Sequence, residues 1–297
     1  MRVAVIGATG TVGAPLVAAL AAEHDVLAIS RSGRTTGGER VESIKADATD
    51  LNSMMRALDG AEVVYHLVHS LGQRDFEASD RAAARAVAAA AAASDARQIV
   101  YLGGLGENDA ELSPHLRSRV ETAEILCQGT VPVTTMRAAM IVGRGSAAFM
   151  TILALVDRLP LMVCPRWVSV ETQPVALTDV VAALFAVCAR EESFDASYDL
   201  GGPEVMTYRS MMERMGTIRG RQPLLVEVPL LTPWLSALWL HLVTPVHAGI
   251  ARPLIEGLKT PTLARDDRVW QLVQTPRSSF EEAVRSALEG KGQGQEA

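Results

Sequence analysis

Short apolar runs alternate with segments of helical periodicity along the first half of the chain. The run at residues 3–6 breaks into glycines, and apolar positions then recur at 16, 17, 19 and 20, which predicts a strand, a tight turn and a helix. Further apolar runs predict strands at 26–29, 41–46, 62–68, 98–102 and 131–136. Helices are predicted between them at 51–58, 76–93 and 113–128. This alternation, over roughly 140 residues, predicts a parallel sheet with helices on both faces.

Residues that begin and end helices support these boundaries. Asp50 is predicted to cap the helix that follows it, and Gly60 to end that helix. Ser113 and Pro114 form a favoured helix start, with serine as N-cap and proline at the first helical position. The alanine-rich helix at 76–93 is predicted to pack tightly on the sheet or on a second subunit, because alanine permits close approach.

The second half of the chain is less regular. Helices are predicted at 175–189 and 207–215, a short strand at 198–200, and a last helix opened by the capping box Ser279-Phe280-Glu281-Glu282. Methionines at 206, 211, 212 and 215 are predicted to fill a core. The fold expected is a Rossmann-type, doubly wound α/β sheet at 1–160, with later segments adding to it. A smaller α/β lobe is expected at 161–290, and a disordered tail at 291–297.

Composition narrows the classes of protein and partner. The chain has 297 residues, of which 48% are apolar and 21% charged, and its net charge of -6 is not concentrated in any block. Nucleic acid is therefore not an expected partner. Cys127, Cys164 and Cys188 lack metal-ligand spacing and are predicted to be buried thiols, with no metal site and a cytoplasmic location.

Neither a leader nor a membrane span is expected. A strand begins within two residues of the N-terminus, so no signal peptide is predicted. The apolar stretch at 230–243 is interrupted and shorter than the ~20 residues that a membrane-spanning helix needs. Peripheral membrane contact stays open.

The glycine-rich turn carries the clearest chemical prediction. Gly7 permits the sharp turn, Gly10 lets a phosphate approach the backbone, and Gly13 lets the helix pack on the strand. Backbone N–H groups and the positive end of the helix dipole then meet at one point, which suits a diphosphate. The residues assigned to this dinucleotide site are Gly7, Thr9, Gly10, Thr11, Val12 and Gly13.

The loop after the second strand bears on the choice of nucleotide. In a dinucleotide fold this loop meets the adenosine ribose, where a guanidinium favours a 2′-phosphate over a free hydroxyl. Arg31 and Arg34 therefore favour NADP(H) over NAD(H), although a solvated loop arginine is the alternative. Asp47 is expected beside the adenine.

Several strings of the sequence together resemble a known family. Gly-Ala-Thr-Gly-Thr-Val-Gly at 7–13, the basic residue after the second strand, and Ala46-Asp47 resemble the atypical short-chain dehydrogenase/reductases with NAD(P)-binding, NmrA-like domains. Strings at 66–70, 100–106, 113–119, 165–167, 173–175, 200–204 and 242–245 are similar to the nucleoside-diphosphate-sugar epimerase-like branch. That branch is distantly similar to the NADPH-binding accessory subunit of respiratory complex I. Leu67, Val68, His69 and Gly103 stand at strand ends, where doubly wound sheets place their ligands, and are added to the expected cofactor site. Arg119 is added because it could position the phosphate or ribose.

The catalytic set that the wider superfamily uses is absent from this sequence. Working members use a tyrosine, a lysine four residues later and a serine at the end of the preceding strand. His115 and Arg119 stand at the helix start, and Gly103 and Gly104 at the strand end, while Tyr101 comes too early. Arginine stays protonated and cannot relay a proton as lysine does.

Two histidines are the candidate replacements. His115 is expected to titrate near neutrality and to share a helix face with Arg119, so it could protonate a substrate carbonyl. The alternative is a helix-surface histidine paired with Glu111 or solvent. His69, with Ser70, ends a strand beside the cleft, and its alternative role is in a loop that caps the sheet.

The sequence leaves three functional hypotheses. The first is an NADPH-dependent oxidoreductase, monomeric or dimeric, that acts on a small apolar carbonyl, enone or quinone. Pro165-Arg166-Trp167 and the segment with Trp234 and Trp239 would line its substrate side, although packing or dimerisation explains the tryptophans equally. The second is a non-catalytic protein that senses NADP(H) or supports a partner. The third is a sugar-nucleotide epimerase or dehydratase.

Overall fold

A seven-stranded, entirely parallel sheet forms the larger part of the molecule. The computed structural model describes residues 1–34, 38–70, 75–106, 112–164, 166–227 and 260–289. The strand order is β11-β6-β5-β4-β1-β2-β3, and every pairing is parallel. The strands are β1 Arg2–Ile6, β2 Asp25–Ser30, β3 Val41–Lys45, β4 Val63–His66, β5 Gln98–Gly104, β6 Val133–Ala138 and β11 Ser197–Leu200. The chain reverses its direction of travel across the sheet between β1 and β4, where doubly wound sheets bind ligands.

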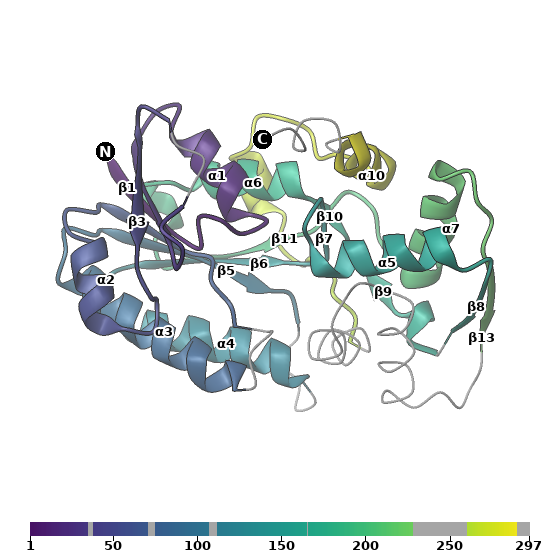
Figure 1. The fold of residues 1–297 in the computed structure, drawn as a ribbon, viewed down its shortest axis with the longest axis horizontal. Helices are drawn as coiled ribbons and strands as arrows, with labels where there is room; N and C mark the ends of the chain where they lie inside the picture. The colour runs from purple at the N-terminus through teal and green to yellow at the C-terminus, as the bar shows by residue number, and fades with distance from the viewer. Residues whose placement is uncertain (35–37, 71–74, 107–111, 165, 228–259, 290–297) are drawn as a thin grey trace.

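Helices cover both faces of this sheet, as Figure 1 shows. Helices α1 (Gly13–Leu20) and α6 (Leu177–Ala186) pack on one face, and α2 (Leu51–Ala57), α3 (Phe76–Ala92) and α4 (Pro114–Cys127) on the other. Strand β1 explains why: Val3 and Val5 point into the first core and Ala4 and Ile6 into the second. A strand that is apolar on both sides requires cover on both sides.

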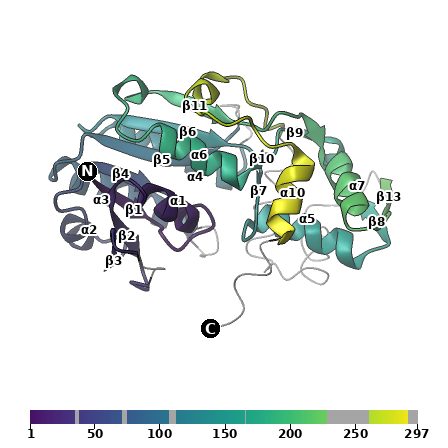
Figure 2. The same ribbon diagram turned by 90° about the horizontal axis from the view of Figure 1, so that it is seen from above.

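The second lobe has a core of its own and lies beside the sheet in Figure 2. Its helices are α5 (Ala147–Arg158), α7 (Tyr208–Ile218) and α10 (Phe280–Glu289). Three two-stranded pairs accompany them: β8 (Leu161–Cys164) with β13 (Leu224–Glu227), β9 (Glu171–Thr172) with β12 (Met206–Thr207), and β7 (Ile141–Val142) with β10 (Val175–Ala176). Of the short 3₁₀ turns, Glu191–Ser193 and Arg268–Gln271 pack beside the seven-stranded sheet, whereas Arg166–Ser169 belongs to the core of the second lobe. All four predicted core methionines are buried here.

The predicted α/β sheet and its flanking helices are confirmed, with a few corrections. The helix predicted at 175–189 begins only at Leu177, because Val175 and Ala176 pair with β7. Cys127 is exposed at the end of α4, so the prediction that all three cysteines are buried thiols is wrong. The predicted start of α4 is confirmed, since the Ser113 hydroxyl accepts a hydrogen bond from the Leu116 N–H.

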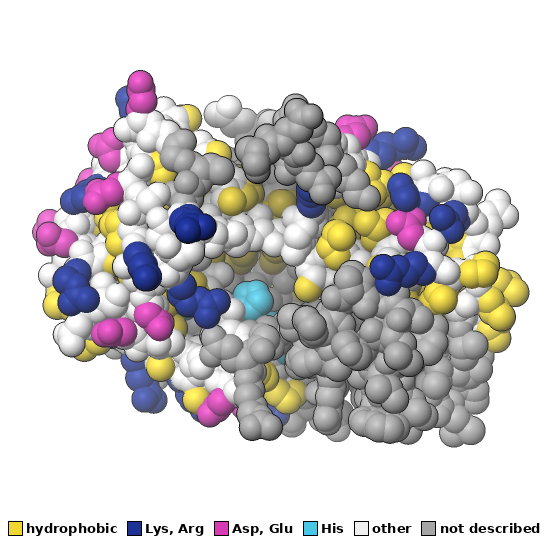
Figure 3. Space-filling model, viewed as in Figure 1, with side chains coloured by type: hydrophobic (Ala, Val, Ile, Leu, Met, Phe, Trp, Pro, Cys, Tyr) yellow, Lys and Arg dark blue, Asp and Glu magenta, His cyan; other side chains and the backbone are white. Residues whose placement is uncertain are grey.

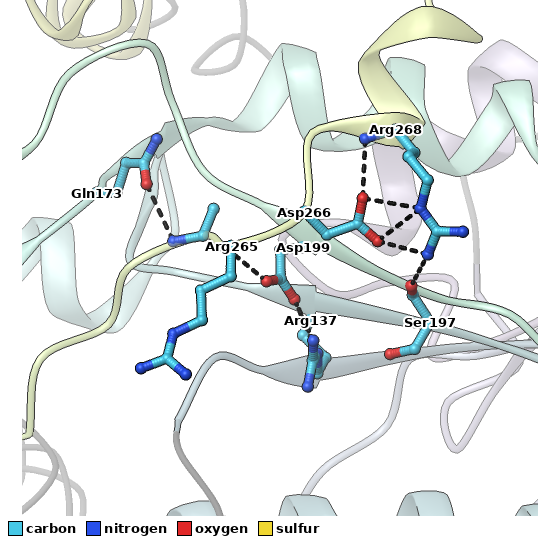
Figure 4. A network of polar contacts seen from close by, with 8 residues as sticks. Arg137, Gln173, Ser197, Asp199, Arg265, Asp266 and Arg268 are labelled. Carbon is cyan, nitrogen blue, oxygen red and sulfur yellow. Dashed lines mark hydrogen bonds and ion pairs between the residues drawn. The ribbon is translucent and has the colours of Figure 1, made fainter.

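A late segment of the chain secures the edge of the sheet (Figure 4). The Asp199 carboxylate, buried in β11, accepts hydrogen bonds from Arg137 Nε at 2.8 Å and from the Arg265 backbone N–H at 2.8 Å. Nearby, the Gln173 side chain accepts the Ala264 N–H. These hydrogen bonds thus join β6, β11 and the segment at 264–265, which are more than sixty residues apart in the chain.

Several sequence predictions fall outside the described residues. Pro165, Trp234, Trp239 and the tail at 291–297 are among them. Within the described ranges, no helix has both the length and the apolar character needed to cross a bilayer. The same ranges hold no cluster of His, Cys, Asp and Glu suited to a metal ion. The boundary predicted at residue 160 stays a prediction.

Candidate functional site

The glycine turn between β1 and α1 has the close approaches that its sequence predicts. Gly7 has a φ of +94°, which a residue with a side chain rarely adopts. A Cβ atom at Gly13 would stand 2.1 Å from the Gly7 carbonyl oxygen, so only glycine lets α1 begin this close to the strand. The Gly7 and Ala8 N–H groups both donate to the Ile29 carbonyl, which ties the turn to β2.

The start of α1 leaves donors available for a ligand. No hydrogen bond between described residues uses the Thr11 or Val12 N–H, and the side chain of Val12, the N-cap residue, supplies no cap. Free N–H groups and the helix dipole favour an anion at this end of a helix. The residues present therefore fit the diphosphate of a dinucleotide.

The loop after β2 presents a guanidinium to the same region. Arg31 is exposed, and its guanidinium donates no hydrogen bond to any described residue. The loop backbone is held instead by Ser30, whose hydroxyl accepts the Gly33 N–H at 3.1 Å. Asp47 lies close enough for the Arg31 charge to contribute to its lowered pKa, although the main cause is the hydrogen bonds that its carboxylate accepts from Thr49.

A cleft of about 340 Å³ joins these features at the carboxyl ends of β1, β2 and β4. Eight of the predicted cofactor residues line it: Gly7, Thr9, Gly10, Arg31, Asp47, Leu67, Val68 and His69. The lining does not include Thr11, Val12, Gly13, Arg34, Gly103 or Arg119. Figure 3 shows the hollow in this face, with a histidine side chain in it and Lys and Arg side chains beside it.

The two candidate catalytic histidines lie together beyond the end of β4. The rings of His69 and His115 meet edge to face, with 6.4 Å between centroids. Arg119 follows His115 by four residues on α4, so the two share a helix face. The structure therefore brings His69, His115 and Arg119 together from two elements more than forty residues apart.

The prediction that His115 titrates near neutrality is wrong. Burial, followed by the neighbouring Arg119 charge, lowers the pKa of His115 to about 3. The Arg119 charge is also the main cause that lowers the pKa of His69 well below its ordinary value, even though this residue is exposed at the mouth of the cleft. Both rings are thus neutral at pH 7, and each can donate an N–H hydrogen bond without carrying a charge. The half-buried position of His115 also disfavours the alternative of a solvated surface histidine.

The structure adds residues that the sequence did not single out. His66 is fully buried at the end of β4, stacked at 5.8 Å on Tyr101, and burial followed by Arg119 lowers its pKa to about 4. Asp80 is a buried carboxylate on α3 that contacts both the loop after β4 and α4. The only sign of this residue in the sequence is that a charged side chain stands on the apolar face of an alanine-rich helix.

Tyr101 is not available as a replacement for the missing tyrosine. Its ring is buried, and its hydroxyl donates to the Arg119 carbonyl oxygen at 3.1 Å. Burial raises the pKa of Tyr101, which opposes ionisation. The strand end beside it carries only Gly103 and Gly104, as the sequence predicts.

Comparison with known proteins decides the family of this region. Residues 7–138 match the family described as NAD(P)H-binding. This part of the chain belongs to the NAD(P)H-binding domain family. The NAD(P)H-binding domain therefore includes the glycine turn, the Arg31 loop, β4 with His69, and α4 with His115.

Sequence relatives agree with this family and with the resemblance to atypical short-chain dehydrogenase/reductases. The chain is 24% identical over 239 residues to the mitochondrial NADH dehydrogenase (ubiquinone) 1 alpha subcomplex subunit 9 of Arabidopsis thaliana, which covers 76% of this chain and 60% of that protein. It is 39% identical over 66 residues to an L-arabinose 1-dehydrogenase (NAD(P)(+)) of Haloferax volcanii, covering 22% of this chain and 24% of that protein. The chain thus spans less than two thirds of either relative.

Solved structures share the fold of the NAD(P)H-binding domain and of the second lobe. A nucleoside-diphosphate-sugar epimerase from Staphylococcus aureus superimposes with a TM-score of 0.78 at 14% identity, covering 96% of this chain and all of that one. A UDP-glucuronic acid 4-epimerase from Bacillus cereus, solved with UDP-glucuronic acid and NAD, has a TM-score of 0.73 at 14% identity and covers 97% and 98%. At these identities the likeness establishes the fold alone.

Proposed function

We propose that this protein is an NADPH-dependent oxidoreductase that reduces a small apolar carbonyl compound, enone or quinone. The observation that carries the cofactor preference is Arg31: it lines the cleft at the end of β2 with no hydrogen-bond partner among the described residues. A guanidinium here complements a ribose 2′-phosphate. The glycine turn would hold the diphosphate, and Leu67 and Val68 would border the nicotinamide half of the cleft.

The chemistry of the proposed reaction divides between cofactor and chain. A reduced nicotinamide, when bound, would supply a hydride to the substrate carbon. The substrate oxygen then gains negative charge, which a neutral imidazole N–H of His69 or His115 stabilises by hydrogen bonding. The Arg119 guanidinium adds a positive field, and water would supply the proton that completes the alcohol, the hydroquinone or, from an enone, the saturated ketone. Donors placed before the reaction where charge develops need no reorganisation.

Titration calorimetry with NADPH, NADP+, NADH and NAD+ in one buffer tests the cofactor assignment. We expect NADPH to bind more tightly than NADH, and Arg31→Ala to remove the difference by weakening NADPH alone, by about tenfold. Arg56→Ala is the matched control, because Arg56 is an exposed arginine on α2 that does not line the cleft. Equal binding of NADPH and NADH by the unchanged protein would refute the preference.

A screen of quinones, enones and ketones for NADPH oxidation tests the reaction. Turnover that falls in His115→Ala and His69→Ala supports the assigned hydrogen-bond donors. If NADPH binds and no acceptor is reduced, the second candidate is favoured: a protein that binds NADP(H) without turnover. The observation behind that candidate is the absence of an exposed tyrosine at the strand end, where Tyr101 is buried.

A sugar-nucleotide epimerase remains the weaker candidate. Its support is that the second lobe, as well as the nucleotide domain, follows the fold of the epimerases compared above. Against it stands the missing acid–base pair. Incubation with NAD+ and UDP-glucose or UDP-glucuronic acid, followed by chromatographic separation of the epimers, tests it directly.

A further inference from the structure

Asp80 occupies an unusual place for a charged side chain. It lies on α3 with only 6% of its surface exposed, in a helix otherwise rich in buried alanine. A buried carboxylate is costly unless its oxygens are hydrogen-bonded, so its partners show what holds it there.

The two carboxylate oxygens of Asp80 accept hydrogen bonds from two different elements. Oδ1 accepts the backbone N–H of Ser70 at 2.8 Å, and Oδ2 accepts the hydroxyl of Ser118 at 2.9 Å. Ser70 follows His69 directly, in the loop after β4. Ser118 lies on α4 between His115 and Arg119. One carboxylate therefore joins the two elements that carry the candidate hydrogen-bond donors.

We propose that Asp80 is a positioning residue that sets the relative orientation of His69, which lines the cleft, and His115, whose ring meets that of His69. The proposal rests on the function proposed above, since it concerns the same site. Ser70 and Ser118 are themselves buried, so the bonds lie away from competing water and hold their geometry more firmly than surface contacts do. A second buried contact, from the Tyr101 hydroxyl to the Arg119 carbonyl, fixes the same helix to β5.

The chain offers a matched control for a purely structural role. Arg81 and Glu121 also join α3 to α4, at 3.0 Å, but this ion pair is partly exposed, and neither side chain bonds to the described part of the loop after β4. Glu121→Gln therefore weakens the same helix pair without touching the His69 loop. Asp80→Asn is the conservative variant, because its carbonyl oxygen can accept the Ser70 N–H while its amide donates to the Ser118 oxygen.

The test is a histidine-labelled NMR measurement on the full chain without cofactor, so that failure of cofactor binding does not affect it. In Asp80→Ala and Ser118→Ala we expect the ring signals of His69 and His115 to shift and their mutual contact to weaken. In Asp80→Asn and Glu121→Gln both signals should stay near those of the unchanged protein. NADPH affinity is expected to change little in Ser118→Ala, Asp80→Asn and Glu121→Gln, because the glycine turn is untouched and the Ser70 N–H keeps its acceptor.

Turnover gives a second readout once an acceptor is found. Misplaced donors in Asp80→Ala should lower kcat by about tenfold to a hundredfold, and Asp80→Asn should restore most of it; in Ser118→Ala kcat should fall while KM for NADPH is kept. Unchanged histidine signals in Asp80→Ala would overturn the proposal. If that variant does not fold, unchanged His115 signals in Ser118→Ala would overturn it equally. Absence of NADPH binding by the unchanged protein would instead refute the proposed function.

Discussion

Replacement of Gly13 by alanine tests the close approach of Gly13 to the Gly7 carbonyl in the glycine turn. The added Cβ would stand 2.1 Å from the Gly7 carbonyl oxygen and 2.9 Å from the carbonyl carbon. Contacts between a Cβ atom and a carbonyl oxygen are normally longer by about 1 Å. Because the contacted atoms belong to the Gly7 backbone, no side chain can rotate away, and the backbone itself must move. The strand end cannot yield freely, because the Gly7 N–H is bonded to Ile29. Overpacking of this size costs about 3 kcal/mol, at the upper end of the usual range.

Denaturant unfolding and NADPH titration together measure this effect. Gly13→Ala should lower the free energy of unfolding by about 3 kcal/mol and weaken NADPH by tenfold or more, since the Thr11 and Val12 N–H groups move with the helix start. Gly38→Ala is the control: its nearest neighbour would be a Val41 methyl at an ordinary 3.7 Å, so we expect a change within about 0.5 kcal/mol and unaltered binding. If Gly13→Ala unfolded with the same free energy and bound NADPH with the same affinity as Gly38→Ala, the close approach of Gly13 to Gly7 would be refuted.

Three further predictions concern stability. Burial lowers the pKa of His66 to about 4, whereas in the unfolded state this histidine becomes protonated below about pH 6.5. The free energy of unfolding therefore falls as the pH drops from about 6.5 to about 4. His66→Phe should reduce the loss measured between pH 7 and pH 5 by about 2 kcal/mol, and an identical pH dependence would contradict the assignment. Arg137→Met leaves the buried Asp199 carboxylate without its ion pair and should cost about 3 kcal/mol in chemical denaturation, most of it recovered when Asp199→Asn is added. Asp50→Ala removes the carboxylate that accepts the Asn52 and Ser53 N–H groups at the start of α2, a loss of about 1 kcal/mol that Asp50→Asn should largely avoid.

The local sequence determined most of the NAD(P)H-binding domain. Apolar runs of four to seven residues between turn residues predict strands, and cap residues such as Asp50 and Ser113 act through hydrogen bonds to their own helix. The glycine turn is equally local, because its constraints arise between Gly7 and Gly13. Each of these features depends on neighbours within a few residues, so the amino-acid sequence suffices to predict them.

Only the tertiary structure decided the arrangement of the candidate site. His69 and His115 meet because β4 and β5 end side by side. The pKa of His69 is lowered mainly by the Arg119 charge, and that of His115 by burial and then by Arg119, and the sequence displays none of these causes. The role of Asp80 likewise emerges only when Ser70 and Ser118 are brought to its two oxygens. Burial and electrostatics depend on distances between residues far apart in the chain. They become definite only when the chain has folded.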